Sequence, residues 1–169
     1  MSSVSKSAPI SRQKPNDRFV LAVKEFIDEG RTTAFRVRGY SMRPFLDHCR
    51  DKVVLAPCRP ESIRRGDVVL AEVSSRCYVL HRVVKREGDR LVLRGDGNVY
   101  GTESCLTTDV IGVATGFLRK GRACPDLTTS VKWRVYSALW PSSPLLRRLL
   151  LAFYRRIVLS LFPSKVVDG

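Results

Sequence analysis

The segment C-Y-V-L-H-R-V-V-K-R-E-G-D-R-L-V-L-R-G-D-G-N, residues 77–98, decides the fold of the chain. Two runs rich in valine and leucine flank Gly88 and Asp89, a pair that favours a turn. A second turn sequence, G-D-G-N, follows at residues 95–98. Short apolar runs separated by glycine turns are typical of β-strands. The segment therefore predicts two strands joined by one turn and followed by another.

The same pattern extends on both sides of this segment. Six strands are predicted in all, at residues 33–37, 52–56, 67–73, 77–84, 90–93 and 109–117. A helix is expected before them, because Asn16 or Asp17 can cap its start and Gly30 can end it. Its apolar positions recur at helical spacing at Phe19, Val20, Val23, Phe26 and Ile27.

Length and composition divide the chain into one domain with two tails. The 169 residues suffice for one domain with a core and are too few for two ordinary ones. Residues 1–15 are polar and are expected to be disordered, residues 16–126 form the domain, and residues 127–169 form a basic amphipathic tail. The predicted fold is mainly β, a coiled set of antiparallel strands with an N-terminal helix and a C-terminal amphipathic helical tail.

The chain is strongly basic, which indicates an anionic partner. Lys and Arg number 30 against 16 Asp and Glu, a formal charge of +14. The basic residues have no aromatic-interleaved RNA motif and no zinc-finger or basic-zipper spacing. We therefore expect no nucleic acid and favour an anionic membrane surface.

The C-terminal tail supports a membrane partner. Over residues 144–162 the arginines Arg147, Arg148, Arg155 and Arg156 are predicted to gather on one side of a helix. Four arginines make crossing a bilayer costly, so the helix is expected to lie on its surface. The alternative is a helix packed on the domain or on a second copy. The predicted apolar face consists of Leu145, Leu146, Leu149, Leu150, Phe153, Ile157 and Leu161.

The cysteines and the first residues indicate a reducing compartment. Five cysteines are scattered singly, without a C-x-x-C pair, and residues 1–15 lack the apolar core of a secretory signal. A cytoplasmic protein, peripheral on the inner face of the membrane, is expected. Cys49 follows His48, but adjacent residues seldom point at each other, so Cys49 is interpreted as a free structural thiol.

One serine stands where a nucleophile could be exposed. Ser41 lies in G-Y-S-M-R-P, residues 39–44, between a glycine and a proline that turn the chain. A serine needs a base within hydrogen-bond reach, and the chain has two histidines, His48 and His81. Taken alone, His81 is a partly buried strand histidine and His48 an exposed loop histidine.

Five motifs together resemble the type I signal peptidases and their LexA-like relatives. G-Y-S-M-R-P is similar to the nucleophile box of that superfamily. The others follow in the same order: R-R-G-D-V-V-L at 64–70, H-R-V-V at 81–84, L-R-G-D-G-N at 93–98 and D-V-I-G-V-A-T-G-F at 109–117. The resemblance implies a serine endopeptidase domain with Ser41 as nucleophile and His81 as general base. A histidine at the base position is similar to the archaeal and endoplasmic-reticulum branch, whereas bacterial members use lysine.

The resemblance leaves the third catalytic residue open. Asp96 is the first candidate to orient His81, Glu103 the second, and a Ser-His dyad without a carboxylate the third. The backbone N–H of Ser41 is implied as an oxyanion donor, and no cofactor or metal is needed. The substrate implied is a leader or precursor peptide bound in extended form beside an edge strand.

Two other functions remain possible on this fold. One is a noncatalytic basic adaptor that binds peptide or nucleic acid, although the presence of both Ser41 and His81 argues against it. The other is a LexA-like self-cleaving regulator, but no helix-turn-helix motif precedes the predicted domain.

Overall fold

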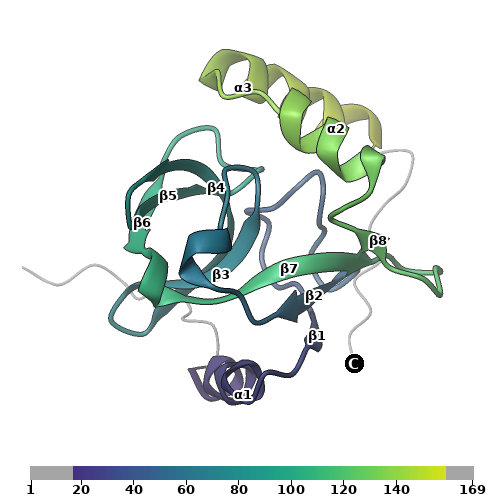
Figure 1. Cartoon of the computed structure of the whole chain (residues 1–169). Helices are drawn as coiled ribbons and strands as arrows, with labels where there is room; N and C mark the ends of the chain where they lie inside the picture. The colour runs from purple at the N-terminus through teal and green to yellow at the C-terminus, as the bar shows by residue number, and fades with distance from the viewer. Residues whose placement is uncertain (1–16, 159–169) are drawn as a thin grey trace, which may run out of the picture.

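The computed structural model describes residues 17–158, which form one antiparallel β-sheet with helices before and after it in the chain (Figure 1). The predicted disordered segment, residues 1–15, lies outside the described residues. The helices are α1 (Asp17–Asp28), α2 (Val131–Leu139) and α3 (Pro144–Phe153), the last continued by a π-helical segment, Tyr154–Val158. The strands are β1 (Thr33–Arg36), β2 (Lys52–Ala56), β3 (Val68–Ser74), β4 (Cys77–Glu87), β5 (Arg90–Arg94), β6 (Glu103–Leu106), β7 (Val110–Leu118) and β8 (Asp126–Leu127).

The strands form one strongly curled sheet. Its order is β1-β2-β7-β3-β4-β5-β6, with β8 paired to β7, and every pairing is antiparallel. The mainly β prediction with helical ends is confirmed. Strands β6 and β8 were not predicted, because E-S-C-L at β6 lacks a run of β-branched residues and β8 has only two residues.

Three apolar clusters form the core. One face of α1 packs Val20, Val23 and Ile27 against the sheet, as the helical spacing predicted. Phe19 and Phe26, which belong to the same predicted set, are exposed. A second cluster fills the space between β4, β5 and β3, and a third lies beneath the loop that carries Ser41.

The segment after β7 belongs to the folded domain and is not a separate tail. Trp133 of α2 is buried in the same cluster as Phe45 and Phe117, with ring centroids 4.5 and 4.7 Å away. Strand β8 pairs with β7 at Gly116 and Phe117. The boundary expected after residue 126 therefore falls inside the domain, because these aromatic contacts form only in the tertiary structure.

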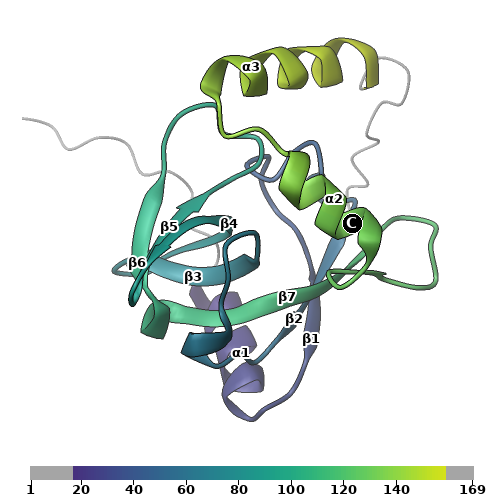
Figure 2. The same cartoon turned by 45° about the horizontal axis from the view of Figure 1, so that its top comes forward.

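Helix α3 lies on the outside of the domain, beyond α2 (Figure 2). Most of its large apolar side chains face solvent, and Leu151 is buried. The predicted position of Arg147 on the outer polar face is wrong, because its side chain is only 2% exposed. Among residues 17–158, no helix is long and apolar enough to cross a membrane. The exposed set consists of Leu145, Leu146, Leu149, Leu150 and Phe153 of α3 and Ile157 of the π-helical segment, whereas Leu161, predicted on the same face, lies outside the described residues.

Candidate active site

Ser41 lies in a loop, residues 37–51, that connects β1 to β2 and is called the Ser41 loop below. The next residue, Met42, is buried in the core with Leu46, and the Leu46 amide donates to the Met42 carbonyl at 2.9 Å. Ser41 itself is half-buried. The core side chains thus fix the turn, and the hydroxyl-bearing residue stays at the surface.

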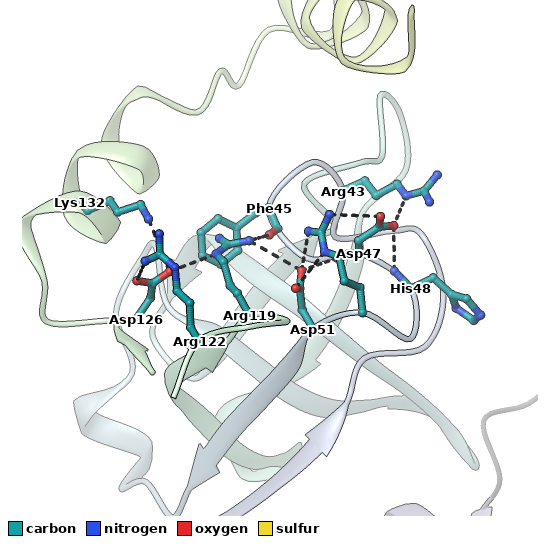
Figure 3. A network of polar contacts seen from close by, with 10 residues as sticks. Arg43, Phe45, Asp47, His48, Asp51, Arg119, Arg122, Asp126 and Lys132 are labelled. Carbon is teal, nitrogen blue, oxygen red and sulfur yellow. Dashed lines mark hydrogen bonds and ion pairs between the residues drawn. The ribbon is translucent and has the colours of Figure 1, made fainter. Parts of the chain in front are cut away.

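Two buried carboxylates hold the Ser41 loop from beneath (Figure 3). Asp47 accepts from Arg43 Nε at 2.6 Å and from the His48 amide at 2.9 Å. The Asp47 amide in turn donates to Asp51 Oδ2 at 2.9 Å. Both carboxylates are fully buried, and a hydrogen bond to a buried charged group is stronger than one at the surface.

Arg119, directly after β7, connects this loop to the sheet. Arg119 donates to the Phe45 carbonyl at 2.8 Å and lies 3.7 Å from Asp51 Oδ2. Its Nε also donates to Asp126 at 3.0 Å. Arg50 donates from Nε and a terminal nitrogen to Asp51 at 3.0 and 2.7 Å. The network therefore ties the loop to the end of β7 through Arg119, as Figure 3 shows, whereas the Arg50–Asp51 pair lies within the loop.

His48 positions the start of the loop. The Gly39 amide donates to His48 Nδ1 at 2.8 Å, so the neutral ring carries its proton on Nε2. Nε2 lies 3.2 Å from Cys49 Sγ. The expectation that these neighbours point apart is wrong, because Cys49 sits in a turn with φ of 54° and not on a strand.

His81 lies on β4 and contacts Glu103 at the start of β6. His81 Nδ1 is 3.0 Å from Glu103 Oε2, and His81 is only 5% exposed. If Nδ1 donates to this carboxylate, Nε2 has a free lone pair that can accept a proton. The contact thus gives the ring the orientation that a general base requires.

Gly95 brings the His81 ring next to Ser41. A side-chain carbon at Gly95 would lie 3.0 Å from His81 Nε2 and 2.4 Å from the Ser41 carbonyl oxygen, so only glycine fits. The Gly97 amide also donates to the Ser41 carbonyl at 2.7 Å. Within residues 17–158 the Ser41 hydroxyl makes no hydrogen bond. Proton transfer therefore requires a closer approach of hydroxyl and ring, which in many enzymes comes with substrate binding.

Asp96 faces away from His81. It accepts two bonds from Arg82, at 2.8 and 2.6 Å, and one from the Tyr136 hydroxyl at 3.2 Å. Arg82 follows His81 on β4, and successive strand residues point to opposite faces of a sheet. The ranking of Asp96 before Glu103 as the partner of His81 is therefore corrected by the contacts. Asp96 is the structural turn residue.

Helix α2 packs over the ion pair of Arg82 and Asp96. Arg82 lies 4.5 Å from the centre of the Trp133 ring and donates to Ser137 Oγ at 2.7 Å. Burial, and then the negative charge of Asp96, raise the pKa of Tyr136 far above its usual value. Tyr136 thus stays a hydrogen-bond donor to the carboxylate.

Helix α3 is hydrogen-bonded to the turn at residues 95–98, which lies beside Ser41 and His81. Arg147 donates to the carbonyls of Gly95 at 2.8 Å, Asn98 at 3.0 Å and Pro141 at 3.0 Å. Burial lowers the pKa of Arg147, and the neighbouring Arg94 charge acts in the same direction. Sequence reasoning placed Arg147 on the polar face of the tail and missed this role, since an arginine that binds backbone carbonyls leaves no periodic pattern.

One known protein family matches most of the chain. The model of the Peptidase S24-like family matches residues 1–115, so the chain belongs to that family. The predicted resemblance to the signal peptidase I and LexA-like superfamily is confirmed. The search of curated proteins and the search of solved structures each gave no match. The matched region contains Ser41, His81, Asp96 and Glu103, whereas α2 and α3 lie beyond it.

Proposed function

We propose that the protein is a serine endopeptidase that cleaves a leader or precursor peptide by the Ser-His mechanism. Ser41 is the nucleophile, His81 the general base, and Glu103 the residue that orients His81. The contact of 3.0 Å between His81 Nδ1 and Glu103 carries the proposal, because it leaves Nε2 beside the Ser41 backbone across Gly95. The peptidase-type fold of the family supports the same assignment.

The reaction follows from these positions. Ser41 Oγ attacks the carbonyl carbon of the scissile bond while its proton passes to His81 Nε2. The Glu103 carboxylate stabilises the imidazolium, which then gives the proton to the leaving amine. Water, deprotonated by the same ring, hydrolyses the acyl-enzyme. The backbone N–H of Ser41 is assigned as a donor to the oxyanion.

An extended peptide suits the edges of the sheet. Strands β1 and β6 are the two ends of the strand order, and each has one side without a neighbouring strand in the described part of the chain. Ser41 follows β1, and Glu103 is the first residue of β6. Because unpaired strand edges bind extended peptides through backbone hydrogen bonds, we place the substrate along an edge strand at the site.

A reagent for activated serines tests the proposal without knowledge of the substrate. A fluorophosphonate is expected to label the wild-type chain at Ser41, because the reagent requires a serine activated by a base. Ser41→Ala and His81→Ala are expected to abolish this labelling. Ser75→Ala, an exposed serine in the turn before β4, is the matched control and is expected to label like wild type. A folded wild-type protein that is not labelled would favour the noncatalytic adaptor.

We further propose that the enzyme works at the inner face of an anionic membrane, bound through α3. Six large apolar side chains of α3 and its π-helical continuation are exposed, and a group of exposed apolar side chains of this kind marks an interaction surface. The burial of Arg147 removes one charge from the outer surface, while Arg148 and Arg155 stay exposed to meet lipid headgroups. The five free cysteines suit the reducing cytoplasm.

Vesicle binding tests this membrane contact. The full chain is expected to sediment with anionic vesicles, and less so in high salt. A double variant, Leu145→Glu with Leu149→Glu, is expected to lose most of this binding, since both side chains lie one turn apart on the exposed face. Val131→Glu is the control, because Val131 is equally exposed but lies on α2. Equal sedimentation of the double variant and the control would exclude α3 as the anchor, and a dimer lost only in the double variant would assign the face to self-association.

A further inference from the structure

A cleft of about 350 Å³ lies at the ends of three adjacent strands, away from the His81–Glu103 pair. Arg36 ends β1, Lys52 begins β2, and Leu118 ends β7. The chain after β7 and the end of the Ser41 loop complete its walls. Six of the eight lining residues are arginine or lysine, and none is acidic. The lining residues of this cationic cleft are Arg36, Cys49, Arg50, Lys52, Leu118, Arg119, Lys120 and Arg122.

The strand register places like charges directly opposite each other. Arg36 pairs with Lys52 across β1 and β2, and Lys52 pairs with Leu118 across β2 and β7. Like charges at directly opposite positions of an antiparallel pair are destabilising. Arg36 and Lys52 therefore repel each other at the edge of the cleft, and an anion bound between them would offset this repulsion by attracting both charges.

Three of the six cations of the cleft form ion pairs with aspartates, and three form none in the described part of the chain. Arg50, Arg119 and Arg122 pair with aspartates of the loop network, with nitrogen to oxygen distances of 2.7, 3.0 and 3.4 Å for the pairs with Asp51 or Asp126. Within residues 17–158, Arg36, Lys52 and Lys120 form no ion pair. Three uncompensated positive charges therefore face one concave surface, where they reinforce one another's attraction for an anion.

We propose that the cationic cleft binds an anion that carries two or more phosphate groups. Arginine presents a planar fork that matches phosphate oxygens, and lysine adds a compact charge. A cleft of this volume accommodates a short chain of phosphates, and its many donors exceed what a single phosphate can use. The anion is either a free polyphosphate or the phosphorylated headgroup of a lipid. None of the residues that line the cleft belongs to α3.

Binding of tripolyphosphate to the full chain, measured by calorimetry, tests the proposal. The triple variant Arg36→Ala, Lys52→Ala, Lys120→Ala is expected to bind at least about tenfold more weakly than wild type. The control removes three exposed cations elsewhere, Arg65→Ala, Lys85→Ala and Arg134→Ala, and so makes the same change in net charge. Equal weakening in both triple variants would overturn the site, because the effect would then come from net charge alone.

Cys49 provides a second readout inside the cleft. Tripolyphosphate is expected to slow alkylation of Cys49 by N-ethylmaleimide, measured by mass spectrometry of the cysteine peptides. Cys124 is exposed and does not line the cleft, so it serves as the reference within the same molecule. Protection of both thiols to the same extent, or of neither, would contradict a ligand bound in the cleft.

Vesicles separate the two sources of phosphate. In the background of the Leu145→Glu and Leu149→Glu variant, vesicles with a bisphosphorylated inositol lipid are compared with vesicles of equal charge made from phosphatidylserine. Preference for the inositol lipid that disappears in the cleft triple variant supports a lipid headgroup, and tripolyphosphate binding without this preference supports a free anion. If duplex DNA alone binds in a cleft-dependent manner, the phosphate-anion proposal is wrong.

Discussion

Replacing Ser41 by alanine is expected to lower kcat for a cleaved leader peptide by roughly 10⁴-fold or more, because nucleophile and base act as one unit. His81→Ala is expected to cause a loss of similar size, and the double variant should be little worse than either single one. Cleavage is followed by mass spectrometry, and circular dichroism shows that each variant is folded. Residual activity close to that of wild type in either variant would remove that residue from the mechanism.

The carboxylate partner of His81 is tested in the same assay. Glu103→Gln is expected to lower kcat by about 10²-fold or more, because an amide cannot stabilise the imidazolium as a carboxylate does. The loss should lie in kcat and not in the melting temperature. Glu87→Gln, an exposed glutamate at the end of β4, is the control. If Asp96→Asn lowers kcat in a fully stable protein while Glu103→Gln does not, the orienting role belongs to Asp96.

Arg82→Met is expected to destabilise the domain by about 3–5 kcal/mol, the usual loss when one partner of a buried ion pair is removed. Asp96 is fully buried and accepts two hydrogen bonds from Arg82, so the variant leaves an uncompensated carboxylate inside the protein. The free energy of unfolding is measured in urea. Arg90→Met, an exposed arginine on the neighbouring β5, is the control and is expected to change this free energy by less than about 0.5 kcal/mol.

A second substitution distinguishes charge burial from lost packing on Trp133. The double variant Arg82→Met with Asp96→Leu is expected to recover part of the lost stability, because no unpaired charge then remains. If the double variant is less stable than the sum of the two single variants predicts, packing against the ring, and not the charge, is what Arg82 chiefly provides.

The fold was predictable where local patterns decide it. The long strands followed from valine-rich runs and glycine turns, and α1 followed from its apolar spacing and end signals. Strand β6 could not be found this way, because E-S-C-L becomes a strand only through its pairing with β5. Asp96 was ranked before Glu103 because it matches the aspartate of the family's turn motif, whereas β6 is what carries Glu103 to His81.

The candidate site was predictable in its motif residues and not in the residues that support them. Ser41 and His81 stand in short recognisable motifs, whereas the roles of Asp96 and Arg147 depend on contacts across the fold. Helical spacing groups Arg147 with Arg148 on one side, yet the tertiary structure turns only Arg147 inward. Periodicity gives the angle between two side chains, but the packing partner decides which of them is buried.

The contacts of Arg147 between α3 and the turn at Gly95 have a geometric consequence for the cleavage that we propose. Because Arg147 binds the carbonyls of Gly95 and Asn98, α3 is hydrogen-bonded directly to the turn beside Ser41. Any surface that receives the exposed leucines then sets the height of the Ser41 hydroxyl above it. If α3 binds a bilayer as proposed, the distance of a peptide bond from the lipid surface would help to decide whether that bond is cleaved, in addition to the side chains around it.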